Sequence, residues 1–374
     1  MKVHIVGGGI GGLTTAIGIA ERRGLEPVVH EAATELRPVG TGIVLGANAL
    51  TALKRLDLTE NIRDVGAEIE VLQILAPDGR SLRNFDLTAT GVGLPYVYLP
   101  RPTLQQLLID QLPGNVIHLN RPCVDVTPAS RSPEQPTIHF EGEQEVTGSV
   151  VIGADGIDSI VRKAVVDQRY RRETGTVTYR GIAPFDASLD GETRQIWGSG
   201  TRVGVAPLGD ERTYWFATAN ESIGDRTILS ALRDRYGHYP APIPAVLDRM
   251  APSEIVVSQL ADVAPLPRWH LGRVALLGDA AHAPLPYLGQ GAGQAIEDGV
   301  ALSVRLATRT PSQAIESYES VRKRRADQVT RLSRYMWRLA QLEGLFAKTR
   351  NMFACRGPAM IARWQQRWLA SARL

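Results

Sequence analysis

The sequence predicts an α/β protein in which a parallel-sheet domain is interrupted by a mostly antiparallel domain and followed by a helical segment. Three observations predict this fold class. Short runs of apolar, β-branched residues end directly in glycine at 3–7, 150–153 and 273–278, as strands buried in a parallel sheet do. Between these runs, strand-like stretches are broken by Asp-Gly and Gly-Asp turns, which favour antiparallel pairing. After these strands the apolar spacing becomes helical to the end of the sequence.

The order of these segments predicts domains that are discontinuous in the chain. With 374 residues the chain is too long for a typical single core. We expect the parallel-sheet domain to take three pieces, 1–70, 100–175 and 265–325. The antiparallel domain is expected to take two pieces, 71–99 and 176–264. The helical segment is expected at 326–374, where apolar residues recur at helical spacing: Val329, Leu332, Met336, Leu339 and Phe346.

The composition excludes several classes of protein. Hydrophobic residues make up 44% of the chain and charged residues 22%, which excludes disordered and collagen-like proteins. No apolar run reaches the roughly 18 residues that span a bilayer, and the first residues lack the basic region of a signal peptide. Cys123 and Cys355 have no nearby histidines, so they predict neither a disulfide framework nor a metal site. We therefore expect a cytoplasmic protein without a metal.

Positive charge is concentrated in the last part of the sequence. The net charge is +3, but Arg322 to Leu374 contains 13 Lys and Arg against two Asp and Glu. The plainest interpretation is a solvated helix face or a segment packed over the first domain. The alternative is a weak contact with an anionic membrane surface or an acidic partner. We expect no binding to nucleic acid, because no recognition motif accompanies the charge.

A glycine-rich loop follows the first predicted strand. Gly7, Gly9 and Gly12 satisfy G-x-G-x-x-G between a strand and a helix. They allow a tight turn, close approach of a pyrophosphate and close helix–strand packing, respectively. Glu31 ends the second strand, 19 residues after Gly12, where a carboxylate can accept both ribose hydroxyls. The combination predicts a Rossmann-like dinucleotide site without separating NAD from FAD.

Two further motifs begin where buried strands end. Ala154–Arg162 reads ADGIDSIVR, and Gly278–Gly291 reads GDAAHAPLPYLGQG. Ligands of open α/β sheets bind at this edge. The second motif runs into a helix near Gly291, whose N-terminus would favour the negative charge of a reduced flavin.

The three motifs, in this order, resemble those of the single-component (class A) flavoprotein monooxygenases, the p-hydroxybenzoate hydroxylase-like superfamily. Within it, the chain looks most similar to urate and salicylate hydroxylase-like members, and the resemblance extends to about Arg325. It implies a GR2-type Rossmann-like FAD-binding domain with an inserted, mostly antiparallel β-sheet substrate domain. It also implies FAD as cofactor and NADH or NADPH as a transiently docking co-substrate.

The resemblance assigns residues to the nucleotide half of FAD. Gly11 and its neighbours would hold the pyrophosphate, and Glu31 with Ala32 the adenosine ribose. The backbone at Cys123 would face adenine. Asp155 belongs to the motif that serves both FAD and the nicotinamide cofactor, and its alternative role is to cap a helix.

The flavin half is assigned in the same way. Val44 would lie beside the ring, Arg101 would reach the phosphates or ribityl chain unless it is a surface residue, and Asp279 would bind the ribityl hydroxyls. Five consecutive residues would carry the pyrimidine edge: Gly289, Gln290, Gly291, Ala292 and Gly293. The sequence departs from the family at Gly293, where many members have asparagine, and at residues 46–48, where Gly-Ala-Asn replaces a common Pro-Asn.

Arg202 and Tyr214 are the candidates for substrate binding. Their 12-residue separation matches an Arg and Tyr pair of the urate hydroxylase-like members. Arg202 would hold a substrate anion or phenolate, and Tyr214 would bind the substrate or relay a proton; alternatively both are ordinary sheet residues. Pro286 would stiffen the loop at the reactive face of the flavin. Further candidates for the pocket wall are Arg180, Trp197, Trp215 and Phe216, of which the adjacent last two cannot both face the pocket.

The implied function is hydroxylation of an aromatic or heteroaromatic small molecule with NAD(P)H and O2 through a flavin C4a-hydroperoxide. Two alternatives use the same cofactor, namely epoxidation of a polyene or terpenoid and FAD-dependent dehydrogenation without oxygen insertion. The expected partners are the aromatic substrate and O2, with the chain acting as a monomer or homodimer. The sequence does not name the substrate or choose between NADH and NADPH.

Overall fold

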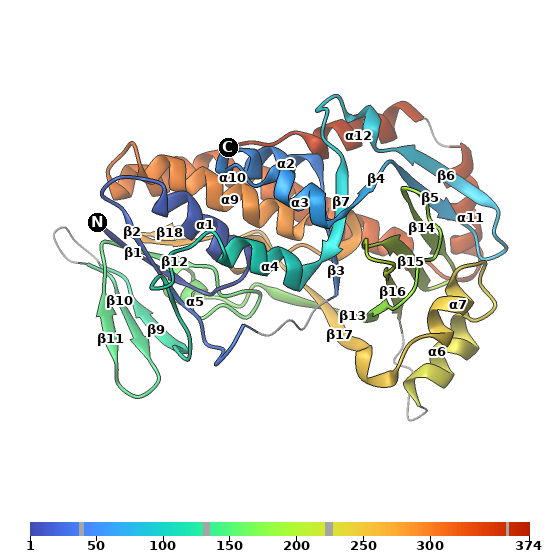
Figure 1. Cartoon of the computed structure of the whole chain (residues 1–374), viewed down its shortest axis with the longest axis horizontal. Coiled ribbons are helices and arrows are strands. Elements are labelled where there is room, and N and C mark those ends of the chain that lie inside the picture. The colour runs from blue at the N-terminus through green and yellow to red at the C-terminus, as the bar shows by residue number, and fades with distance from the viewer. Residues whose placement is uncertain (37–40, 130–134, 221–226, 357–358) are drawn as a thin grey trace.

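The computed structural model describes residues 1–36, 41–129, 135–220, 227–356 and 359–374. Two sheet-based units follow one another along the long axis, with the N-terminus at one end and the large antiparallel sheet at the other (Figure 1). Helices α10 (Pro311–Ala340), α11 (Gly344–Arg356) and α12 (Ala359–Ala370) form the last part of the chain. The predicted fold class is confirmed. None of the helices in these ranges combines the length and apolar character needed to cross a membrane.

The first unit is built on a six-stranded sheet with the order β18-β19-β12-β1-β2-β8. Its strands are β1 (Lys2–Val6), β2 (Glu26–His30), β8 (Ile117–His118), β12 (Val150–Gly153), β18 (His270–Leu271) and β19 (Val274–Leu276). All neighbours are parallel except the edge pair β18–β19. The carboxyl ends of β1, β2, β12 and β19 therefore share one edge, and each is followed directly by a predicted motif.

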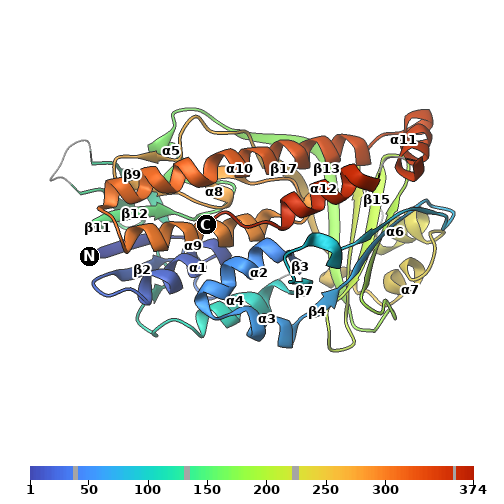
Figure 2. The ribbon, with the colours of Figure 1, turned by 90° about the horizontal axis from the view of Figure 1, so that it is seen from above.

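Helices α1 (Ile10–Ala20) and α9 (Gly291–Leu306) pack closely against each other beside this sheet (Figure 2). Small residues make the approach possible. A Cβ atom at Gly18 would lie 2.3 Å from Ser303 Oγ, and one at Gly299 would lie 2.8 Å from Thr15 Oγ1. This contact holds the N-termini of both helices at the carboxyl edge of the sheet, where their free N–H groups favour negative charge.

The second unit is a seven-stranded sheet with the order β17-β13-β16-β15-β14-β5-β6. Its strands are β5 (Val71–Leu75), β6 (Ser81–Asp86), β13 (Arg171–Ala183), β14 (Glu192–Trp197), β15 (Thr201–Pro207), β16 (Thr213–Ala219) and β17 (Val256–Val263). Only β14 and β5 pair in parallel. One face packs on α6 (Ile228–Tyr236) and α7 (Ile243–Asp248), with Trp215, Val203 and Val205 in that core. Because side chains alternate, the residues between these point to the first unit.

Smaller elements join the two units. A three-stranded sheet of β3 (Gly42–Leu45), β7 (Tyr96–Pro100) and β4 (Ala67–Ile69) lies between them. Around it lie α2 (Ala47–Leu53), α3 (Thr59–Val65), α4 (Arg101–Ile109) and the short η2 (Thr88–Thr90). The first unit also carries α5 (Val161–Val165), α8 (Asp279–His282) and the strands β9 (Cys123–Thr127), β10 (Thr137–Phe140) and β11 (Glu145–Thr147).

The basic C-terminal segment packs back onto both units. Helix α12 contacts α2 and η2, and α11 contacts β6. The expected solvated face holds for Arg331 and Arg338, which are exposed, but Arg322, Arg325 and Arg350 are buried. These three cations are therefore part of the core, and of the two interpretations the solvated face is wrong for them.

We predict that Gly18→Ala lowers the free energy of unfolding by about 1–3 kcal/mol, because the added methyl group overpacks the α1–α9 contact. Chemical denaturation with circular dichroism measures the change. Gly114→Ala is the matched control, since no atom lies within 4 Å of its Cβ position. Equal stability of the two variants would contradict close α1–α9 packing.

Candidate active site

The glycine loop has the geometry that a dinucleotide needs. Gly7 has φ +108°, and its N–H donates to the carbonyl of His30 at 2.8 Å. A Cβ atom at Gly12 would lie 2.1 Å from the carbonyl oxygen of Gly7, so helix and strand meet here without room for a side chain. Beside Gly9, by contrast, no atom lies within 4 Å of the Cβ position. This open approach to the backbone, at the N-terminus of α1, fits a pyrophosphate.

Glu31 lies beside this loop at the end of β2. Its carboxylate accepts the Gly8 N–H at 2.7 Å and the Ala33 N–H at 2.9 Å, which fixes it at the sheet edge. The Glu31 carbonyl accepts the N–H of Arg121, so the segment leading to Cys123 runs alongside. Burial, with a smaller effect of Asp155, raises the pKa of Cys123 to about 12. The structure thus brings Glu31, Ala32 and Cys123 to one edge, around the position expected for the adenosine.

Asp155 makes local bonds. Its carboxylate accepts hydrogen bonds from Ser159 Oγ at 2.5 Å and from the N–H groups of Ile160 and Val161 at 2.7 and 3.1 Å. These bonds hold the turn before α5 and match the alternative role as a helix cap. A contact of this carboxylate with FAD or the nicotinamide cofactor stays a prediction.

Asp279 begins α8 at the end of β19. Its side chain is open to solvent although its neighbours Gly278 and Ala280 are buried. Surrounding protein still displaces enough water to raise its pKa, against the opposing effects of His282, Arg101 and Arg162. The carboxylate is therefore accessible, and the two nearby arginines supply positive charge. This donor set fits the hydroxyls and phosphates of FAD.

Residues 289–293, predicted to hold the flavin ring and called the flavin segment below, pack against residues 44 and 48. Gly289 has φ +62°, and its Cβ position lies 2.7 Å from Val44 Cγ1. Gln290 is buried, and its side-chain oxygen accepts from Asn48 Nδ2 at 3.1 Å. A Cβ atom at Gly293 would lie 3.1 Å from the same Asn48 nitrogen. Glycine at 293 therefore leaves room for Asn48, which gives a physical reason for the departure from the family pattern at 293.

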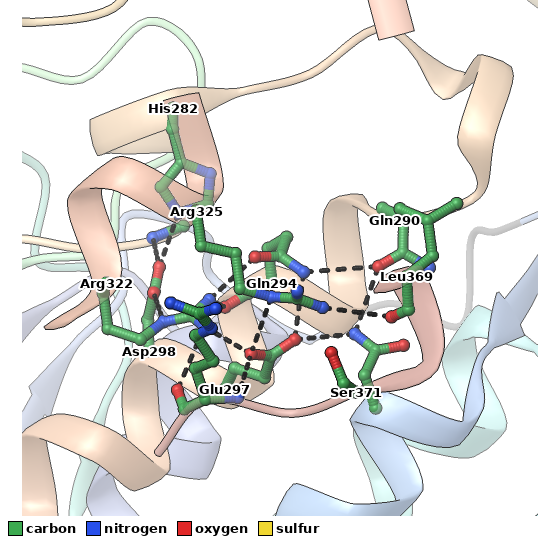
Figure 3. A network of polar contacts seen from close by, with 12 residues as sticks. His282, Gln290, Gln294, Glu297, Asp298, Arg322, Arg325, Leu369 and Ser371 are labelled. Carbon is green, nitrogen blue, oxygen red and sulfur yellow. Dashed lines mark hydrogen bonds and ion pairs between the residues drawn. The ribbon is translucent and has the colours of Figure 1, made fainter. Parts of the chain in front are cut away.

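A buried charge network lies directly behind this segment (Figure 3). Arg322 Nε donates to Asp298 Oδ1 at 2.7 Å, and its Nη1 bonds to Glu297. Asp298 Oδ2 accepts the N–H of Gly278 at 2.9 Å and contacts His282 Nε2 at 2.5 Å. Burial alone would raise the pKa of Asp298, but His282 and Arg322 outweigh it and lower the pKa. Since these three residues hold α8 and α9 in place, His282 is a structural histidine.

The same network reaches the flavin segment and the C-terminal residues. Glu297 Oε1 accepts from Asn48 Nδ2 at 2.7 Å and from Gln294 Nε2 at 2.9 Å. On the other side, Arg322 donates to the carbonyl of Arg373 at 3.2 Å. Arg325 donates to the carbonyls of Trp368 and Leu369 at 3.0 Å each. Residues 368–373 therefore complete the shell that holds the N-terminus of α9.

Arg202 lies on the face of the large sheet that looks toward the flavin segment. Its guanidinium donates to Gln195 Oε1 at 2.7 and 3.1 Å, and stacks over the rings of Tyr287 at 4.8 Å and Phe216 at 5.1 Å. It is 5% exposed, and it has no carboxylate partner among the described residues. Burial lowers its pKa, but a guanidinium remains charged. A buried, uncompensated cation costs several kcal/mol, which an anionic ligand would offset.

Tyr214 lies two side-chain steps from Arg202 on the same face. The strand register places Arg202 opposite Thr218, and Gly204 opposite Phe216, between the two candidates. Tyr214 packs against β3, since a Cβ atom at Gly42 would lie 2.4 Å from its ring. Burial raises the pKa of Tyr214, so its hydroxyl is a neutral donor at physiological pH.

The remaining wall candidates divide as alternation requires. Trp215 is fully buried in the α6–α7 core, whereas its neighbour Phe216 faces the flavin side, so only one of the pair lines the pocket. Arg180 shares this side, opposite Phe216, and donates to Ser258 Oγ at 2.9 Å. Pro286 is exposed and begins η4 (Pro286–Leu288), which places Tyr287 over Arg202.

Sequence reasoning missed the residues that support the site from behind. Glu297 and Asp298 lie about two helical turns after the third motif, on the helix that the motif begins. This spacing was the signal that could have identified them. Arg322 was hidden in the basic run and looked like a surface residue. Gln341 was missed as well: its side-chain amide donates to Tyr287 Oη and Thr218 Oγ1 at 2.8 Å each, and so links the flavin segment to the large sheet.

We predict that Asp298→Asn lowers the free energy of unfolding by about 3–5 kcal/mol, because the buried Arg322 loses one of its two negatively charged partners. The lowered pKa of Asp298 sets the pH dependence: the ionised carboxylate stabilises the fold above its ordinary pKa of 3.8. The difference in unfolding free energy between wild type and variant should therefore be largest near pH 7 and should shrink as the pH falls below about 4. Urea denaturation at several pH values measures it.

Asp110→Asn is the control for this prediction, because Asp110 is exposed and bonds only to Gln106 among the partners described. Its effect should stay within about 0.5 kcal/mol. A pH-independent deficit in Asp298→Asn would contradict the role of the ionised carboxylate.

Known proteins resemble the chain over nearly its whole length. The model of the FAD binding domain family matches residues 1–333. The chain is 33% identical over 356 residues to the aurachin C monooxygenase/isomerase of Stigmatella aurantiaca, covering 93% of this chain and 91% of that protein. It is 31% identical over 338 residues to the FAD-dependent urate hydroxylase of Mycolicibacterium vanbaalenii, covering 87% and 85%.

The fold has a close counterpart among solved structures. HpxO of Klebsiella pneumoniae, solved with FAD and uric acid, superposes with a TM-score of 0.91 at 22% identity, covering 99% of this chain and 97% of that one. The match over residues 1–333 agrees with the glycine loop and the motifs found at the carboxyl edge of the parallel sheet. The chain belongs to the FAD binding domain family and is a flavoprotein of the class A aromatic monooxygenases.

Proposed function

We propose that this flavoprotein hydroxylates an aromatic or heteroaromatic small molecule, using O2 and NADH or NADPH, and that the substrate binds as an anion at Arg202. The observation that carries the second part is a buried guanidinium with no carboxylate partner among the described residues, facing the flavin segment. An electron-rich ring with an ionisable oxygen or nitrogen supplies the missing negative charge. The relatives that act on aurachin C and urate support a heteroaromatic ring.

The roles of the residues follow from their positions. FAD, when bound, supplies the hydride acceptance and oxygen activation that side chains cannot provide. Arg202 holds the substrate anion and raises the electron density of its ring, which favours attack by an electrophilic oxygen. Tyr214, neutral because burial raises its pKa, donates a hydrogen bond to the substrate. Phe216 and Tyr287 stack around Arg202 and keep water from screening its charge.

The alternatives use the same cofactor with a different substrate. A polyene or terpenoid epoxidase would bind a neutral hydrocarbon, and a buried cation beside such a substrate would gain no partner. An FAD-dependent dehydrogenase would remove hydride without inserting oxygen. Arg202 therefore favours hydroxylation over epoxidation. A hydroxylase and a dehydrogenase are distinguished by whether the product contains an added oxygen atom.

We propose direct FAD contacts for Gly9, Gly11, Glu31, Asp279 and the segment 289–293. The chain is proposed to act as a monomer or homodimer without nucleic acid. For its basic C-terminal segment we propose a weak contact with a membrane surface, supported by 13 basic against two acidic residues.

The experiment is to follow NAD(P)H oxidation by the FAD-loaded protein in air against a panel of phenols, purines, quinolones and terpenoids. Mass spectrometry then reads the products. Stimulated oxidation with a product about 16 Da heavier, carrying a new phenol group, is expected, because one oxygen atom is inserted. An epoxide, an unsaturated product, or a flavin that NAD(P)H never reduces would each contradict the proposal.

We predict that Arg202→Gln lowers kcat/KM for the identified substrate by about 100-fold, because the variant loses a charge-assisted bond to the substrate anion. FAD affinity should be unchanged, since Arg202 contacts the substrate side. Steady-state kinetics and flavin fluorescence titration measure the two quantities. Arg194→Gln is the control, because Arg194 pairs with Glu192 on the opposite face of the same sheet. A kcat/KM for Arg202→Gln equal to that of this control would refute anion binding at Arg202.

A further inference from the structure

Helix α11 carries a stripe of large apolar side chains on its outer face. The four most exposed large apolar residues in the described parts of the chain all lie between 345 and 364: Leu345 (75%), Phe346 (73%), Trp364 (68%) and Phe353 (66%). Met352 is 47% exposed. Positions 345, 346, 352 and 353 recur at the spacing of one helical face. Phe346 was expected to continue the apolar stripe of 329–339, but the chain breaks at 341–343 and it lies on this separate helix instead.

The inner face of α11 is fixed in place by the small buried residue Ala347 and by several polar contacts. Arg350 is buried, and it donates to the carbonyls of Ala340 at 2.6 Å and Gly198 at 2.7 Å. Its guanidinium also stacks over Trp197 at 5.3 Å. Near the end of the helix, Arg83 donates to the carbonyl of Ala354 at 3.0 Å. The helix is thus anchored by small apolar residues and by polar contacts, whereas its large apolar side chains face outward.

Exposed basic residues lie on α11 itself and on the helix that follows it in sequence. Residues 344–374 contain six basic residues and no acidic one. Lys348 and Arg356 on α11, and Arg363 and Arg367 on α12, are exposed. The nearest acid in sequence, Glu343, precedes the helix and bonds to Asn220 at 2.5 Å. Exposed aromatic rings beside lysine and arginine are the composition of helices that lie in a membrane interface.

The position of α11 suits contact with an extended surface. It lies at the end of the molecule farthest from the N-terminus in both views, outside the large sheet (Figures 1 and 2). It contacts β6 of that sheet, and its Arg350 contacts Trp197, the register partner of Arg202. A surface bound at α11 would therefore lie at the substrate-side end of the protein.

We propose that α11 docks the protein on an anionic lipid surface, with Leu345, Phe346, Met352 and Phe353 entering the interface and Lys348 and Arg356 pairing with lipid phosphates. The charge argues against a second copy of this chain as the occupant. A two-fold contact would bring the same basic face against itself, with no acidic residue in 344–374 to offset it. The surface lies outside the flavin site, so the proposal is independent of the reaction catalysed.

Flotation of the full-length, FAD-loaded protein tests the proposal. The vesicles are pure phosphatidylcholine, or phosphatidylcholine with about 30% phosphatidylglycerol, at low and high salt. We expect binding to the anionic vesicles that weakens as salt rises. Phe346→Asp with Phe353→Asp should weaken binding about 100-fold, since two buried rings are lost. Lys348→Gln with Arg356→Gln should weaken binding to anionic vesicles only.

Val65→Asp on α3, 37% exposed, should bind vesicles as wild type does. Bound FAD and melting temperature should match wild type in every variant, because all the changed side chains are exposed. No flotation of wild type, or equal flotation of the Phe346 and Phe353 variant, would overturn the proposal. So would mass photometry showing that this variant turns a dimer into a monomer, since the face would then belong to a second copy.

Discussion

The flavin end of the molecule depends on one buried ion network, in which Arg322 joins Glu297 and Asp298. All three side chains are fully buried, so each charge is tolerated only because the others are present. Asp298 holds the backbone at Gly278, while Glu297 holds Asn48. The network therefore sets the distance between α8, α9 and α2, the three elements around the segment 289–293.

Alternating side chains in the large sheet give its two faces different chemistry. The residues facing α6 and α7 are apolar and make a conventional core. Those facing the first unit include two arginines, a glutamine and aromatic rings, which would be costly to bury without a purpose. Gly204 opposite Phe216 leaves space for that ring to lie between Arg202 and Tyr214. One face of the sheet thus forms the hydrophobic core of the unit, and the other face positions the charge of Arg202.

The sequence predicted the elements whose signals are local. Glycine spacing after apolar strands located Gly7, Asp155 and Asp279, because the carboxyl edge of a parallel sheet gathers them whatever the loops do. The burial of Arg322 and Arg325 could not be predicted, because burial of an arginine depends on partners 24 to 51 residues away. The outward turn of the α11 apolar stripe was equally hidden, since periodicity predicts a face but not which way it points.

The contacts of residues 368–373 bear on the order in which the protein matures. The family model ends at 333, yet Arg322 and Arg325 lie in that region with donors that bond to carbonyls of 368, 369 and 373. A nascent chain that has emerged only to α10 has every flavin motif but still exposes these two guanidinium groups to water. Arg325 and one donor of Arg322 therefore gain their carbonyl partners only when residues 368–373 fold back, so the shell behind α9 is completed by the segment made after every predicted flavin motif.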